Sequence, residues 1–165
     1  MKRELSLTLA FLLLSGVGLV ARDKDEGFNG KWELDNSSQQ PANAPKKMQT
    51  KIKQDGSGLT IESTFAEPAD GVVPLVYLGV MATKVHLSTG GQTEQNAIGP
   101  FQMGSKTDID GTQIQTEWTA MVKGDAVQGH WTHKLSDDGK HMTWEIKESS
   151  TQGQHAEATL RFVRK

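Results

Sequence analysis

Three tryptophans recur at a constant spacing in the second half of the chain: Trp118, Trp131 and Trp144 are thirteen residues apart. Each lies in a run where polar and apolar side chains alternate, which predicts a β-strand with the indole on its apolar face. An indole brings a large apolar surface and a single N–H donor. These residues therefore predict either the lining of a cavity for an apolar or aromatic small molecule, or a filled core.

Further side chains are expected on the same inner face. His133 is two residues beyond Trp131, so both should point the same way. Hydroxyl groups there would accept hydrogen bonds from the indole N–H groups or orient the polar end of a ligand. The hydroxyl residues with this parity are Ser63, Ser105, Thr107 and Thr116. The remaining predicted lining, each member of which is also a candidate core residue, is Phe65, Tyr77, Phe101 and Met103.

Metal binding and catalysis are not expected from the pattern of titratable residues. The chain has no cysteine, and His130 and His133 are three residues apart, which places them on opposite faces of a strand. Glu148 has inward parity near a strand end, but an enzyme would require it to converge with His133. Dinucleotide-binding, phosphate-binding and zinc-protease motifs are absent from the sequence. We therefore expect no metal, no cofactor and no enzymatic activity.

Turns between the alternating runs set the expected strand register. A two-residue turn at Gly124-Asp125 would place Trp118 directly opposite Trp131. An even-numbered turn within residues 136–139 would then put Trp144 on the same face, opposite either His133 or Trp131. A two-residue turn at residues 110–111 would place Met103 opposite Trp118.

The rest of the chain continues this pattern of strands and turns. We expect a first strand at residues 28–34, a hairpin that pairs Ile52 with Ile61, a second hairpin formed by residues 84–88 and 93–98, and a last strand at residues 156–162 after a turn at Gly153. Residues 72–82 are almost continuously apolar and fit a buried strand or a short lid helix. Because successive hairpins leave open edges unless the sheet closes, the prediction is an all-β, antiparallel up-and-down barrel of eight to ten strands.

The N-terminus has the layout of a secretory signal peptide. Residues 1–21 combine a short basic start, an apolar segment and small residues, and an uncleaved anchor is the alternative. Residues 22–27 form a charged linker, and residues 28–165 form the single barrel domain. Basic and acidic residues are balanced at 18 and 20, which gives no reason to expect nucleic-acid binding. We expect an exported protein, periplasmic or extracellular, that does not bind a membrane after cleavage.

The beginning and the end of the predicted barrel carry a family resemblance. Gly30-Lys31-Trp32 on the first strand, with Arg161 or Arg164 on the last, resembles the lipocalin and fatty-acid-binding (calycin) superfamily. Residues 43–46, 53–56 and 135–144 look like exported bacterial lipocalin-like proteins of unknown function. The resemblance implies a lipocalin-like barrel in which the arginine packs on Trp32 and plugs the closed end. It implies no particular activity.

Two hypotheses for function remain after these observations. The first is a non-enzymatic, exported barrel that binds or transports a small hydrophobic molecule between its tryptophans. The alternative is a filled barrel that acts as a structural or protein-interaction module without a small-molecule ligand. An enclosed apolar pocket that touches all three indoles would favour the first hypothesis, and a solid interior would favour the second.

Overall fold

The computed structural model describes residues 27–40, 44–65, 84–98 and 101–165, and within them the side chains of all residues except Phe65 and Ile98. The predicted signal peptide, nearly all of the linker and residues 72–82 lie outside this part of the chain. The strands are β1 (Gly30–Leu34), β2 (Met48–Asp55), β3 (Gly58–Phe65), β4 (Lys84–Ser88), β5 (Thr93–Ile98), β6 (Phe101–Asp110), β7 (Gln113–Val122), β8 (Asp125–Leu135), β9 (His141–Ser150) and β10 (His155–Arg164).

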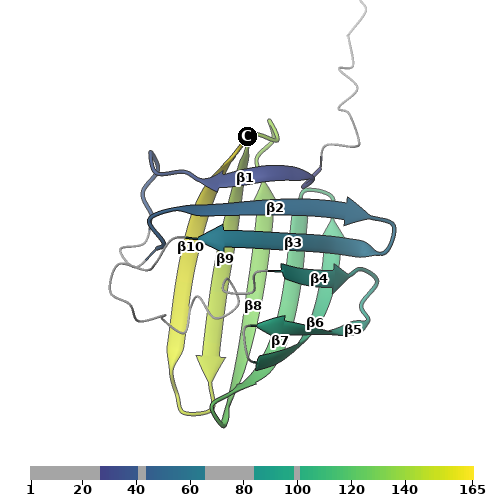
Figure 1. Cartoon of the computed structure of the whole chain (residues 1–165), viewed down its shortest axis with the longest axis vertical. Helices are drawn as coiled ribbons and strands as arrows, with labels where there is room; N and C mark the ends of the chain where they lie inside the picture. Colours follow the sequence, from purple (N-terminus) through teal and green to yellow (C-terminus); the bar gives the residue numbers. More distant parts are fainter. Residues whose placement is uncertain (1–26, 41–43, 66–83, 99–100) are drawn as a thin grey trace, which may run out of the picture.

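All ten strands belong to one antiparallel sheet in the order β4-β3-β2-β1-β10-β9-β8-β7-β6-β5. The sheet curls so that β1–β4 run across the strands β6–β10, as Figure 1 shows. The two ends of this order, β4 and β5, are consecutive in the chain and come back into contact. The protein is therefore a nearly closed up-and-down β-barrel, as the sequence predicts.

Two predicted registers are wrong by two residues. The turn after β7 is formed by Lys123 and Gly124, with φ of 51° and 85°. Positive φ at both central positions is the mark of a type I′ hairpin turn, which matches the twist of the strands. As a result Trp118 pairs with Gly129, and not with Trp131. Because a shift of two residues preserves the side-chain face, all three tryptophans still point inward.

The turn between β6 and β7 lies one residue later in the chain than predicted. Asp110 pairs with Gln113, so Gly111, with φ of 55°, is the first central residue of the turn. That position of a type II′ turn requires positive φ, which glycine adopts without strain. Met103 consequently lies opposite Ala120, and not opposite Trp118 as predicted. Other predictions hold: Ile52 pairs with Ile61, and Gly153 has a φ of 80°.

The predicted hairpin between β4 and β5 is not formed as a regular ladder. Side chains of β5 bond to the backbone of β4 instead, since Asn96 accepts from the N–H of His86 at 2.9 Å and donates to its carbonyl at 2.7 Å. Glu94 accepts from the N–H of Ser88 at 2.7 Å. We call the contacts of Asn96 and Glu94 with β4 the seam. The seam satisfies strand-edge groups that would otherwise be exposed.

The interior is an apolar core to which β1–β4 and β6–β10 contribute, as far as the side chains are described. Its buried hydrophobic residues are Phe28, Trp32, Leu34, Met48, Ile52, Leu59, Ile61, Val85, Leu87, Met103, Ile114, Trp118, Ala120, Val127, Trp131, Met142, Trp144, Ile146, Ala158, Leu160 and Phe162. Among residues 27–40, 44–65, 84–98 and 101–165, no helix is long and apolar enough to cross a membrane.

Candidate functional site

The three tryptophans of β7, β8 and β9 form a continuous row on the inner face of the barrel. Trp118 and Trp131 have ring centroids 5.5 Å apart and planes tilted by 49°. Trp131 and Trp144 are 5.7 Å apart and nearly perpendicular, at 83°. Tilted and edge-to-face geometries are the ones that aromatic rings prefer. The row is therefore a single packed unit, with Trp131 at its centre.

Gly129 makes room for the first member of this row. It lies directly opposite Trp118 and has inward parity. A Cβ atom added at Gly129 would be only 2.2 Å from the indole of Trp118, so the ring occupies the space that a side chain would fill. Gly129 was not among the residues predicted for the site. The available signal was a glycine at an inward position within an otherwise alternating strand.

His133 extends the row at its other end. It pairs across the strands with Trp144, which is one of the two predicted alternatives, and its ring lies 4.5 Å from the Trp144 ring at 33°. The side chain is fully buried. Desolvation by this burial lowers the pKa of His133 to about 3, so the imidazole is neutral at physiological pH. We call Trp118, Trp131, Trp144 and His133 the indole wall.

The polar atoms of the indole wall have no hydrogen-bond partner among the described residues. This holds for the indole nitrogens of Trp118, Trp131 and Trp144 and for both ring nitrogens of His133. Hydroxyl groups share the same inner face, but they bond elsewhere: Thr50 with Ser63 at 3.1 Å, Thr107 with Thr116 at 3.0 Å, and Ser105 with Asn96 at 3.3 Å. Of the two alternatives predicted for these hydroxyls, acceptance from the indole N–H groups is therefore not observed, and orientation of a ligand stays a prediction.

Titratable groups do not converge at the wall. Glu148 is buried on the inner face opposite Gly129, whereas His133 lies opposite Trp144. Four residues along a strand correspond to about 13 Å, which separates the carboxyl group from the imidazole. His130 faces outward and bonds Thr132 at 3.1 Å. In the described part of the chain, no three His, Asp or Glu side chains are grouped so that they could hold a metal ion.

The fourth tryptophan, Trp32, lies at a separate site near the C-terminal end of β10. Its indole N–H donates to the carbonyl of Phe28 at 2.9 Å. The guanidinium of Arg164 lies 4.4 Å from the centre of the Trp32 ring, and its Nε donates to the carbonyl of Gly139 at 2.8 Å. Arg161, the other arginine considered, is exposed and donates to the carbonyl of Gln39 at 2.7 Å. We call Phe28, Trp32 and Arg164 the closed-end cluster.

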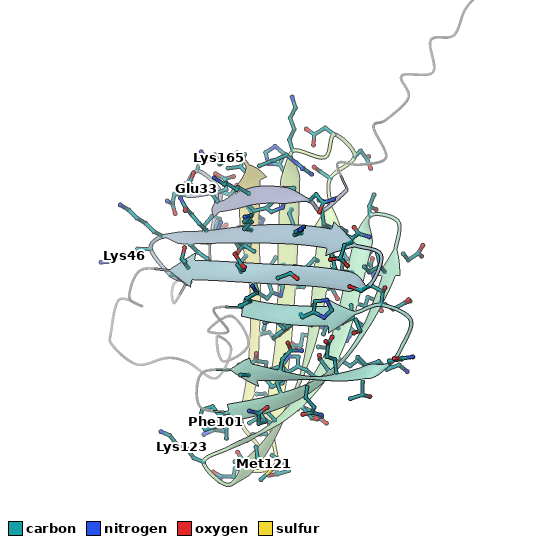
Figure 2. The ribbon with its side chains drawn as sticks, turned by 45° about the vertical axis from the view of Figure 1, so that its right-hand side comes forward. Glu33, Lys46, Phe101, Met121, Lys123 and Lys165 are labelled. Atoms are coloured by element: carbon teal, nitrogen blue, oxygen red, sulfur yellow. The ribbon has the colours of Figure 1, made fainter. Side chains whose placement is uncertain are left out.

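The remaining predicted lining residues are dispersed. Met103 is fully buried on β6. Phe101 is half-buried at the start of β6, and Figure 2 places it at the same end of the barrel as Met121 and Lys123, away from Glu33 and Lys165. Tyr77 and the side chain of Phe65 lie outside the described part of the chain.

Four of the cavities formed by the described residues are among the best defined, and they open on the outer surface. The largest, of about 730 Å³, lies over β5–β10 and includes outward-facing Lys106, Glu117 and His130. The others, of about 400, 440 and 280 Å³, likewise include exposed side chains. None of the four is lined by Trp131, Trp144 or His133. They are therefore not the enclosed apolar pocket that the ligand hypothesis expects.

Comparison with known proteins supports the fold. The sequence matches no protein-family model and no curated protein. Among solved structures, the chain is similar to a secretory abundant heat soluble (SAHS) protein from Ramazzottius varieornatus, with a TM-score of 0.57 and 13% identity over 84% of this chain and 96% of that one. It is also similar to secretory abundant heat soluble protein 4 of the same organism, with a TM-score of 0.52 and 13% identity over 85% and 96% of the two chains. At this identity the likeness shows the shared barrel fold alone.

Proposed function

We propose that the barrel binds a small, mainly apolar molecule against the indole wall. The observation that carries this proposal is the set of buried indole and imidazole nitrogens without a partner among the described residues. Buried polar groups in native proteins are nearly always hydrogen-bonded, and a buried donor left without a partner costs about 1–3 kcal/mol. A ligand that supplies acceptors would recover this free energy while its apolar part packs on the rings.

We further propose that the protein is an exported binding protein and not an enzyme. Its predicted signal peptide supports export, and the two similar structures are described as secretory. The separation of His133 from Glu148 along the barrel supports a binding role, because acid–base catalysis needs groups within reach of one reacting centre.

A second candidate is a filled barrel with a structural or protein-interaction role. It is favoured by the unbroken ring contacts, which run from Trp118 through Trp131 to Trp144 and on to Phe162 at 6.4 Å. The four outward-opening cavities agree with this reading as well.

Native mass spectrometry of the protein purified from its own host separates the two candidates. A retained ligand would appear as mass in excess of the polypeptide that is lost on denaturation. A mass equal to that of the polypeptide, together with unchanged tryptophan fluorescence across a panel of lipophilic compounds, would favour the filled barrel.

A further inference from the structure

We infer that the ligand of the indole wall is uncharged and carries a hydrogen-bond acceptor, such as a ketone, ester, amide or ether oxygen, on an otherwise apolar body. This inference rests on the proposed function and narrows it to one class of molecule. It excludes a carboxylate such as a fatty-acid anion, and it excludes an amine.

Hydrogen bonding at the indole wall favours a ligand group that accepts. Trp118, Trp131 and Trp144 are at most 2% exposed and each offers one donor and no acceptor. Neutral His133 adds one donor and one acceptor. Because donors outnumber acceptors by four to one on this wall, the complementary group on a ligand is an acceptor.

The charges of the interior also restrict the ligand. The buried polar and charged side chains of the described residues are Thr50, Ser63, Ser105, Thr107, Thr116, Thr132, His133 and Glu148, which include no lysine and no arginine. The guanidinium of Arg164 is directed to backbone carbonyl groups at the closed end. A carboxylate moved from water to the wall would lose its hydration without gaining a cationic partner there, which is strongly unfavourable.

An amine does not fit the indole wall, although aromatic faces attract cations. An ammonium group has donors only, so it cannot accept from an indole N–H. The ring faces are also engaged by one another: Trp131 lies between Trp118 and Trp144, and Trp144 also stacks on His133. An uncharged acceptor meets the hydrogen-bonding requirement of the whole indole wall. An ammonium group satisfies none of the indole donors, and the one buried carboxyl group of the described residues, that of Glu148, lies opposite Gly129 at one end of the wall.

The experiment titrates the full exported chain with four decyl compounds, n-decane, 2-decanone, decanoate and decylammonium, at pH 7 by isothermal calorimetry. We expect 2-decanone to bind at least about tenfold more tightly than either ion, the difference that 1.4 kcal/mol produces. In Trp131→Phe, which keeps an aromatic ring but removes one donor, affinity for 2-decanone should fall about fivefold to tenfold. Affinity for n-decane should be unchanged. Met121→Ala, at an exposed position, is the control and should bind like the wild type.

The outcomes are distinguishable. If decanoate or decylammonium binds as tightly as 2-decanone, the inference on charge is wrong while the proposed function stands. If Trp131→Phe lowers the affinity for n-decane and for 2-decanone equally, the affinity depends on the indole ring and not on its N–H donor. The inference on hydrogen bonding is then wrong. If none of the four compounds binds, both the inference and the proposed function are overturned.

Discussion

Trp32 and Trp131 are buried to the same degree, at 1% exposure each, but their surroundings differ. In the closed-end cluster the N–H of Trp32 has an acceptor and the ring carries a cation on its face. In the indole wall, Trp131 has rings on both sides and no acceptor among the described residues. Burial alone therefore does not separate a packing tryptophan from a candidate contact residue, whereas hydrogen bonding does.

The difference has an energetic consequence. Every group of the closed-end cluster contributes to the stability of the folded chain, because ring, donor and guanidinium all have partners. The indole wall combines favourable ring packing with donors whose desolvation is not compensated. Loss of the indole N–H should therefore lower the free energy of unfolding in the closed-end cluster and change it little in the indole wall.

Trp32→Ala should give the largest effect. It removes a buried indole, its bond to Phe28 and the surface on which Arg164 packs, so the free energy of unfolding should fall by about 3–5 kcal/mol. Urea denaturation followed by circular dichroism measures this loss. Arg161→Ala, at an exposed position of the same strand as Arg164, is the control and should change stability by less than about 0.5 kcal/mol. A similar loss in both variants would contradict the assignment of Arg164 as the partner of Trp32.

Gly129→Ala should destabilise the wall by overpacking. The added methyl group would overlap the Trp118 indole, at 2.2 Å before any shift, so we expect a loss of about 1–3 kcal/mol. Gly124→Ala is not a suitable control because of its positive φ, but Thr119→Ala, an exposed position on β7, is. The double variant Gly129→Ala with Trp118→Phe should recover part of the loss in the same denaturation experiment. No recovery would mean that the glycine is needed for another reason.

Acid should destabilise the fold through His133. Its pKa is about 3 in the folded protein, below the ordinary value of 6.5, so the unfolded chain takes up the proton first. Its contribution to stability is complete above pH 6.5 and is lost as the pH falls from 6.5 towards 3, at up to about 1.4 kcal/mol per pH unit. Chemical denaturation should show that the free energy of unfolding falls by about 2 kcal/mol between pH 7 and pH 5. This decrease should be absent in His133→Leu. His130→Gln, on the outer face, should retain the loss. An unchanged slope in His133→Leu would show that other groups cause it.

Trp131→Phe should give the smallest effect on stability. The variant buries less apolar area, which lowers the free energy of unfolding, but it also removes a buried donor without an acceptor, which raises it. The net change should therefore be within about 1 kcal/mol. Trp32→Phe is the matched comparison. It should lower the free energy of unfolding by at least about 1 kcal/mol more than Trp131→Phe does, because it removes the donor bonded to the carbonyl of Phe28. Equal losses in these two variants, measured by urea denaturation, would remove the distinction between the two regions.

The sequence predicted strand faces better than strand partners. Alternation placed Trp118, Trp131 and Trp144 on one inner face, and a register error of two residues left that face unchanged. The predicted partner of Trp118 was wrong because choosing between Lys123-Gly124 and Gly124-Asp125 as the turn depends on backbone angles, with a lysine at φ of 51°. A positive φ at a non-glycine residue is uncommon and has no reliable sequence signal.

The seam between β4 and β5 could not be predicted from the sequence, for a different reason. Residues 84–98 have the alternation and the glycine turn of a hairpin, yet Asn96 and Glu94 replace the ladder with the seam. The choice between Arg161 and Arg164, in contrast, follows from alternation: Arg164 shares the parity of the buried Leu160 and Phe162, and Arg161 does not. The seam could not be inferred from alternation, because it depends on how the barrel closes.

The central claim is that the indole N–H groups of the wall donate a hydrogen bond only when a ligand supplies the acceptor. The N–H of Trp32 already donates to the carbonyl of Phe28. Two-dimensional ¹H–¹⁵N NMR of protein labelled at the tryptophan indole nitrogen tests it directly, with the four signals assigned from single Trp→Phe variants. On addition of 2-decanone, the account predicts that the signals of Trp118, Trp131 and Trp144 shift while that of Trp32 remains in place. Unchanged signals for all three wall residues, or an equal shift for Trp32, would contradict it.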